Sequence, residues 1–209
     1  LVYMEKFSNI KPDNFMQNIK LTSLAFICFF ILIGTPIKAE SQLRFEHISK
    51  EDGLASSTIY QTLEDKNGFL WVATGDGLQR YDGNTFKTFL HDPNDKHSLP
   101  ENYIRRLLED DDGNIWVGTE NGLSIYLQDK EIFIPFDFEL PQEQKIEANK
   151  IRMLYRSSNG IIWIGSYAGL TRYNPETGHK NTYNFHTVRT IAEKNENELI
   201  LGTLGHGLF

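Results

Sequence analysis

The segment QTLEDKNGFLWVATGDGLQRYD, residues 61–82, decides the fold because the chain repeats it. Close copies are RLLEDDDGNIWVGTENGLSIYL at residues 106–127 and MLYRSSNGIIWIGSYAGLTRYN at residues 153–174. A weaker copy, TIAEKNENELILGTLGHGLF, covers residues 190–209 and has Ile200 in place of the tryptophan. The tryptophans of the first three copies lie 45 and 47 residues apart, at Trp71, Trp116 and Trp163. Repetition at intervals of roughly 20–50 residues indicates a repeat architecture.

The pattern inside each copy predicts four short β-strands. In the first copy, apolar residues indicate strands at residues 59–64, 69–74, 78–81 and 85–90. The turns between them are rich in Asp, Asn and Gly, which tolerate the left-handed backbone of tight hairpins. No helical periodicity follows residue 39. A four-stranded meander about every 45 residues is typical of a β-propeller blade.

We therefore predict an all-β fold, a partial β-propeller with three complete four-stranded blades and part of a fourth. The repeat cores lie near residues 57–90, 102–134, 149–185 and 186–209. In each complete copy a small residue follows the tryptophan two positions later, at Ala73, Gly118 and Gly165. A large aromatic side chain inside a strand usually fills a core. We expect each tryptophan and its small residue to pack between adjacent blades.

The first 39 residues differ from the rest of the chain. Residues 21–33 form an uncharged apolar run, preceded by Lys20 and followed by Gly34, Pro36 and Ala39. The run is short for the ~20 residues that a membrane-spanning helix needs, and its flanks are typical of a secretory signal peptide. We predict a signal helix at residues 16–39, the propeller domain at residues 40–209, and a gene-start artefact at residues 1–15. An uncleaved membrane anchor is the alternative.

The charge balance restricts the partners of the exported chain. The full sequence has 21 basic and 28 acidic residues, and removal of residues 1–39 leaves 17 against 26. Such an acidic surface repels a phosphate backbone, so we expect no nucleic-acid partner. The single cysteine, Cys28, lies in the leader. The exported chain therefore has no thiol for a disulfide, a metal site or a nucleophile.

The pattern D-x-x-G-x-[IL]-W-[VI]-[AG]-[TS]-x-x-G-L-x-x-[YI] of the copies resembles the two-component regulator propeller repeat. The stretch RFEHISKEDGLASSTIYQTLED, residues 44–65, is similar to the start of such a region, and HDPNDKHSLPENYI, residues 91–104, resembles its inter-blade connector. The third copy departs from the pattern with Arg156 and Ser157 where an aspartate would begin the turn. The fourth copy lacks the tryptophan and contains one extra residue.

Propellers of this family form the extracytoplasmic sensor regions of bacterial hybrid histidine kinases, many of which respond to polysaccharide fragments. The resemblance therefore implies a periplasmic sensor of a phosphorelay, with an oligosaccharide as its ligand. It also implies a downstream kinase region, an anchor in the inner membrane and a homodimer for the full-length protein.

The number of copies is low for a closed ring, because propellers close with about 4–8 blades. Residues 45–48 resemble residues 86–89, the outermost strand of the first blade. In a closed ring, we expect this N-terminal segment to be a closing strand that completes a last blade, whose other strands come from the far C-terminus of the full-length protein. On this interpretation the sequence is an N-terminal fragment of a longer protein.

Two sets of residues are candidates for ligand binding. The hairpin tips differ between the copies, as expected for a face that binds one asymmetric ligand, at Asp76, Glu120, Asn121, Tyr167 and His206. A second set lies in the first strand of each copy, where each member directly follows an apolar residue: Tyr60, Arg105, Arg152 and Arg189. Convergent guanidinium groups would bind carboxylates or sulfates of an acidic glycan, and a tyrosine would stack on a sugar. Alternatively, the tips are ordinary turns and each arginine pairs with an acid on the neighbouring blade.

Catalytic motifs are missing from the sequence, which has no HExxH, P-loop, GxGxxG or GxSxG pattern. We therefore predict neither an enzyme active site nor a metal or cofactor in this chain, although the full-length protein would be a histidine kinase. One alternative is a secreted propeller hydrolase or lyase that uses Asp76 and Glu120 as paired carboxylates. A surface scaffold that binds protein through a propeller face is another.

Overall fold

The computed structural model describes residues 45–209, of which His47–Phe209 form one compact unit. The predicted signal peptide at residues 16–39 and the gene-start segment at residues 1–15 lie outside the described residues. Within the described part, no helix has the length and apolar character needed to cross a membrane.

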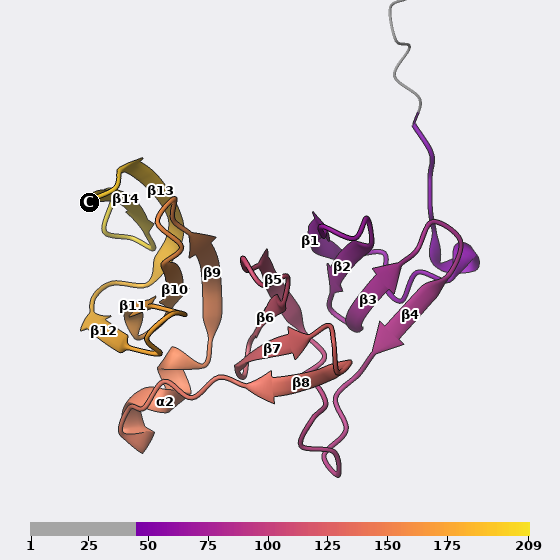
Figure 1. Ribbon diagram of the computed structural model, residues 1–209, viewed down its shortest axis with the longest axis horizontal. Coiled ribbons are helices and arrows are strands. Elements are labelled where there is room, and N and C mark those ends of the chain that lie inside the picture. Colours follow the sequence, from indigo (N-terminus) through magenta and orange to yellow (C-terminus); the bar gives the residue numbers. More distant parts are fainter. Residues whose placement is uncertain (1–44) are drawn as a thin grey trace, which may run out of the picture. The chain divides into compact units, whose positions relative to one another are not determined.

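Three four-stranded antiparallel sheets and one two-stranded sheet follow one another along the chain (Figure 1). Blade 1 consists of β1 (Ile59–Glu64), β2 (Leu70–Thr74), β3 (Gly77–Tyr81) and β4 (Phe86–Phe89). Blade 2 consists of β5 (Ile104–Glu109), β6 (Ile115–Thr119), β7 (Leu123–Leu127) and β8 (Ile132–Pro135). Blade 3 consists of β9 (Ile151–Arg156), β10 (Ile162–Ser166), β11 (Gly169–Tyr173) and β12 (Lys180–Asn184). Blade 4 contains β13 (Val188–Asn195) and β14 (Glu198–Thr203).

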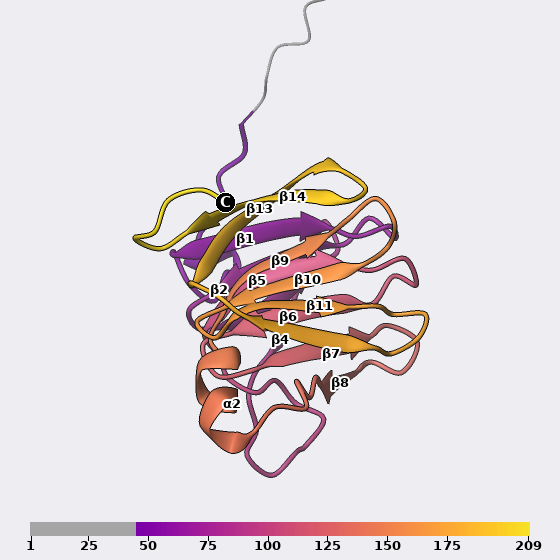
Figure 2. The same cartoon turned by 90° about the vertical axis from the view of Figure 1, so that its left-hand side faces the viewer.

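The predicted partial propeller is confirmed by this arrangement. Strands that are consecutive in sequence are neighbours in each sheet, so every blade is a meander. The first strands of successive blades lie beside one another, β1 next to β5, β5 next to β9 and β9 next to β13 (Figures 1 and 2). The side chains that project from these inner strands are therefore close enough to act together.

Two short helices correct the prediction that no helix follows the leader. A 3-10 helix spans Lys50–Asp52, with Ser49 and Asp52 forming a capping box. Helix α2, Gln142–Ala148, lies in the connector between β8 and β9. Apart from Ile146, its sequence QEQKIEA consists of residues with good helix propensity. At seven residues it is too short to show the periodicity by which helices are recognised in a sequence.

The expected closing strand at residues 45–48 is not formed in the described structure. Phe45 is 90% exposed, and the segment has no ladder hydrogen bonds. A β-strand is defined by its pairing with a neighbouring strand, so similarity to residues 86–89 is not sufficient to create one. The other strands of the last blade are the predicted partners of this segment, and they are not among the described residues, so the closing strand stays a prediction.

Packing of the tryptophans between blades is confirmed for the first two copies. The ring of Trp71 lies 5.2 Å from that of Tyr126 in blade 2, measured between centroids. Trp116 lies 5.4 Å from Tyr173 in blade 3. Both tryptophans are buried, whereas Trp163 in the third copy is only half-buried beside the two strands of blade 4. A complete neighbouring blade is what buries the indole.

An aspartate at the start of the first turn fixes each buried indole. Trp71 Nε1 donates a hydrogen bond of 2.7 Å to Asp65 Oδ2, and Trp116 Nε1 donates one of 2.9 Å to Asp110 Oδ2. In the third copy Ser157 takes the place of the aspartate, and its hydroxyl bonds within its own turn instead. The departure seen in the sequence therefore removes the partner of Trp163.

The small residues let the inner strand of the next blade approach. A Cβ added to Gly118 would lie 2.5 Å from Ile151 Cγ2, and one added to Gly165 would lie 2.8 Å from the Val188 carbonyl oxygen. Both distances are far below van der Waals contact. The absence of a side chain at these positions sets the spacing between blades 2 and 3 and between blades 3 and 4.

We predict that Gly118→Ala lowers the free energy of unfolding by about 1–3 kcal/mol, because overpacking forces the two strands apart. Gly75→Ala is the matched control, since its added Cβ would meet the rings of Tyr103 at 3.6 Å and Tyr60 at 3.8 Å, both ordinary contacts. Urea unfolding followed by tryptophan fluorescence measures both. Equal stabilities of the two variants would contradict the assigned role of Gly118.

Candidate ligand-binding site

The first strand of each blade has a β-bulge at its second residue. In β5, Ile104 is opposite Thr119 and Arg106 is opposite Gly118, so the residue between them has no partner. The same register shift occurs in β1, β9 and β13. A bulge leaves one residue unpaired and re-aims its side chain. The unpaired residues are the four predicted on the first strands, Tyr60, Arg105, Arg152 and Arg189.

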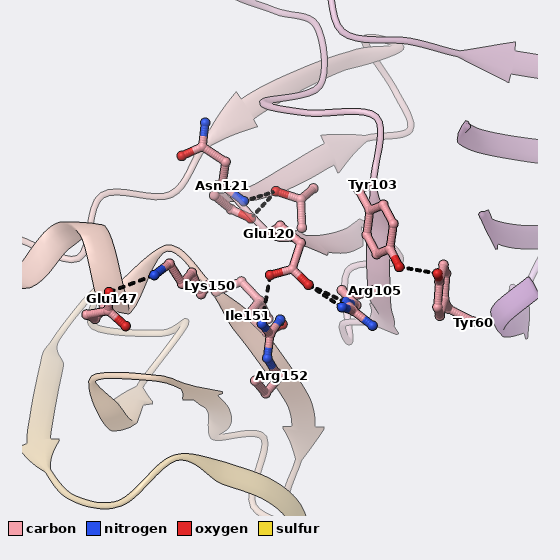
Figure 3. Close-up of polar contacts among 11 residues, drawn as sticks. Tyr60, Tyr103, Arg105, Glu120, Asn121, Glu147, Lys150, Ile151 and Arg152 are labelled. Atoms are coloured by element: carbon pink, nitrogen blue, oxygen red, sulfur yellow. Dashed lines mark hydrogen bonds and ion pairs between the residues drawn. The ribbon is translucent and has the colours of Figure 1, made fainter. Parts of the chain in front are cut away.

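Glu120 joins two of these arginines (Figure 3). It lies in the turn between β6 and β7, and its Oε1 accepts hydrogen bonds from the Arg105 guanidinium. Its Oε2 accepts a 2.7 Å hydrogen bond from Arg152 Nη2. Because Arg152 belongs to blade 3, the ion pair connects two blades. The alternative interpretation, in which an arginine pairs with an acid on the neighbouring blade, therefore describes Arg152, whereas Arg105 pairs within its own blade.

Tyrosine rings support both guanidinium groups. Arg105 Cζ lies 4.7 Å from the ring centroid of Tyr103 and 5.1 Å from that of Tyr60. The hydroxyl groups of these two tyrosines are hydrogen-bonded to each other. Arg152 Cζ lies 4.4 Å from the ring centroid of Tyr167, which occupies the same hairpin position as Glu120. Cation–π contacts of this kind hold the guanidinium groups in place.

These tyrosines, Arg105, Arg152, Glu120 and their neighbours form a cluster at the bulges, and positive charge is in excess around it. Burial lowers the pKa of Arg106, and the charges of Arg105, Arg189 and Arg152 lower it further. The Arg106 guanidinium donates a 2.8 Å hydrogen bond to the Arg105 carbonyl oxygen. Within residues 45–209, neither Arg106 nor Arg189 has a carboxylate within ion-pair distance. The inner strands therefore present cationic charge that their own acids do not balance.

Glu101 is the other acidic residue of the cluster. Burial raises the pKa of its carboxyl group, and the charge of Glu120 raises it further. Its Oε2 atom is buried and has no hydrogen-bond partner among the described residues. Glu101 is therefore a weaker acid than an exposed glutamate.

The remaining predicted residues do not join the cluster. Asp76 and Asn121 are exposed turn residues whose backbone NH groups donate to the preceding Thr74 and Thr119 hydroxyls. Figure 3 shows the Asn121 side chain directed away from the arginines. His206 is exposed and stacks on His186, with ring centroids 3.6 Å apart. For these three tips, the structure agrees with the interpretation as ordinary turns.

Sequence reasoning missed three members of the cluster, Tyr103, Arg106 and Glu101. Tyr103 and Glu101 lie in the connector before β5. The alternation of a strand does not extend to this connector, so the sequence does not indicate which way their side chains point. A signal for Arg106 is present in the sequence. Two polar residues follow Ile104 before the next apolar residue, which interrupts the alternation of a regular strand and is consistent with a bulge.

The electrostatics of Glu120 oppose a role as a general acid. Burial raises the pKa of its carboxyl group, but hydrogen bonds and charges of Arg152 and Arg105 outweigh burial and place the pKa below the ordinary value of 4.5. A catalytic acid needs a raised pKa so that it is protonated near neutral pH. Glu120 is instead held ionised.

We predict that Glu120→Gln lowers the free energy of unfolding at pH 7 by about 1–3 kcal/mol, because buried Arg152 loses a charged partner. The depressed pKa of Glu120 means that its stabilisation is complete above pH 4.5 and is lost as the pH falls through the lower folded-state value. Urea titrations between pH 7 and about pH 3 measure the difference. A difference that does not depend on pH would contradict the ionised pair.

Comparison with known proteins agrees with the propeller fold of the blades. Residues 53–76, 98–121 and 145–168 match the family described as a two component regulator propeller. The chain carries two-component regulator propeller repeats. Each matched segment runs from the connector before a blade to the tip of the β2–β3, β6–β7 or β10–β11 hairpin. The matched segments thus contain three of the four bulge residues, all but Arg189, together with Glu120 and Tyr167.

Similar proteins include a histidine kinase and the extracellular domain of a two-component system. Histidine kinase P4 of Formosa agariphila is 36% identical over 85 residues, which are 40% of this chain and 6% of that protein. The extracellular domain of a hybrid two-component system, BT3049 of B. thetaiotaomicron, has a TM-score of 0.71 at 24% identity. That match covers 78% of this chain and 24% of the domain. The chain thus spans only a small part of each of these relatives.

A lyase has a more distant likeness to the chain. Virginiamycin B lyase of Staphylococcus aureus has a TM-score of 0.50 at 16% identity, covering 68% of this chain and 48% of the lyase. At such low identities, both structural likenesses show the propeller fold alone.

Proposed function

We propose that these blades belong to an extracytoplasmic sensor that binds an oligosaccharide and signals to a histidine kinase region of the same protein. The observation that carries this proposal is the cluster at the bulges, where residues of three consecutive blades combine tyrosine rings with guanidinium groups. Tyrosine faces stack on sugars, and guanidinium groups donate several hydrogen bonds to hydroxyl or carboxylate oxygens. The propeller repeats and the histidine kinase relative support a role in two-component signalling.

The geometry suggests how binding would be transmitted. Tyr60 belongs to blade 1, Arg105 and Glu120 to blade 2, and Arg152 and Tyr167 to blade 3. A ligand that contacts all three blades stabilises the arrangement of blades that it fits and shifts the population toward it. In the full-length protein, anchored in the inner membrane and paired as a homodimer, this shift would be read by the kinase region.

We predict that Tyr60→Ala and Tyr167→Ala each weaken oligosaccharide binding about tenfold, which corresponds to about 1.4 kcal/mol. Each substitution removes a ring that stacks on sugar and also supports a guanidinium group. Isothermal titration of the full-length periplasmic region with neutral and acidic oligosaccharides measures the change. Tyr183→Ala is the matched control, because Tyr183 is an exposed tyrosine on β12, the outer strand of blade 3.

A failure of every oligosaccharide to bind would overturn the proposed function. Binding that is equally strong in all three tyrosine variants would leave a sensor role intact but would remove the binding site from the inner strands.

A further inference from the structure

Glu120 occupies a position that is built to receive a carboxylate. Its two oxygens bind different guanidinium groups, Oε1 that of Arg105 and Oε2 that of Arg152. Each guanidinium is already positioned from behind, Arg105 by the rings of Tyr60 and Tyr103, and Arg152 by the ring of Tyr167 and by the Ile151 carbonyl oxygen. Two preorganised cations on neighbouring strands match the planar geometry of one carboxylate.

The backbone around Glu120 is fixed by hydrogen bonds, whereas its side chain is partly exposed and is held by Arg105 and Arg152. Asn121 N donates to the Thr119 hydroxyl, which itself donates to the Gly122 carbonyl oxygen, and Gly122 N donates to the Asn149 carbonyl oxygen. The Glu120 side chain is 26% exposed, whereas that of Arg152 is only 8% exposed. Rotation of the glutamate side chain would therefore vacate the arginines without rebuilding the hairpin.

Comparison of the hairpins shows that this acid is particular to blade 2. The position that follows the threonine or serine of each hairpin is Gly75 in blade 1, Glu120 in blade 2, Tyr167 in blade 3 and Leu204 in blade 4. The fold of the hairpin thus does not require an acid at this position. Without Glu120, the charge of Arg105 and Arg152 would add to the unbalanced charge of Arg106 and Arg189.

We propose that Arg105 and Arg152 form a carboxylate-binding site that Glu120 fills in the free protein, and that the carboxylate of an acidic oligosaccharide displaces Glu120 from it. This inference rests on the proposed function, and it specifies a uronic-acid ligand. Glu120 then sets specificity, because only a ligand that replaces its charge restores the ion pairs. After displacement, the carboxylate of the ligand takes the place of Glu120 in the ion pair with Arg152 of blade 3.

The carboxylate-binding site is tested without knowledge of the natural ligand. Glu120→Ala leaves the two arginines without their carboxylate, and sodium acetate is added at constant ionic strength. We expect acetate to raise the melting temperature of this variant saturably, while the wild type and the Glu120→Ala/Arg152→Ala double variant do not respond. Asp111→Ala is the matched control, because Asp111 forms an ion pair between blades 2 and 3 with a single, partly exposed arginine, Arg156.

The absence of any acetate effect specific to Glu120→Ala would overturn the carboxylate-binding site. If Glu120→Ala does not fold at any concentration of acetate, it is replaced by Glu120→Gln, which keeps the volume of the side chain. This second variant is titrated with trigalacturonate and with the methyl ester of trigalacturonate. We expect the acid, but not the ester, to bind at least tenfold more tightly than to the wild type. Equal affinities for the wild type and the variant would overturn displacement, whereas binding of neutral sugars alone would leave the proposed sensor function standing.

Discussion

The approach of β9 to Gly118 and of β13 to Gly165 is the constraint on which the rest of the structure depends. Gly118 has room for no side chain because Ile151 of blade 3 fills the space. Ile151 directly precedes Arg152, so the contact that sets the distance between the blades also brings this arginine to Glu120. Packing between blades and the geometry of the candidate site are therefore two results of one contact.

The repeat made most of this fold predictable. Three copies in register located twelve strands, because turn residues recur at the same offsets and the apolar residues between them have few alternatives. The miss concerns a connector between two of the repeat cores. Helix α2 lies in the connector before β9, whose sequence differs from that of the connector before β5, so the other copies gave no guide to its structure. Local similarity identifies a repeat unit, whereas strand formation depends on a neighbour.

The candidate site was predictable in position and less so in chemistry. The register of the copies placed Tyr60, Arg105 and Arg152 at equivalent points, and the structure brings all three to one cluster. The sequence did not show that Glu120 would engage two of them at once, because this contact depends on the distance between blades. It also did not reveal Arg106, whose importance comes from a bulge that shifts the strand by one residue and leaves two arginines in succession.

The two ends of the interface between blades 2 and 3 have different physical characters. At one end, Arg156 and Asp111 form an ion pair whose side chains are 38% and 67% exposed, so water screens it and it contributes little to stability. At the other end, the Arg152 side chain is 8% exposed, and Glu120 is its one ion-pair partner among residues 45–209. A buried charge is costly to leave without a partner, so loss of Glu120 must be compensated by another anion or by movement of the strand. At the Arg152 end of the interface, the binding of an anion is therefore coupled to the relative position of blades 2 and 3.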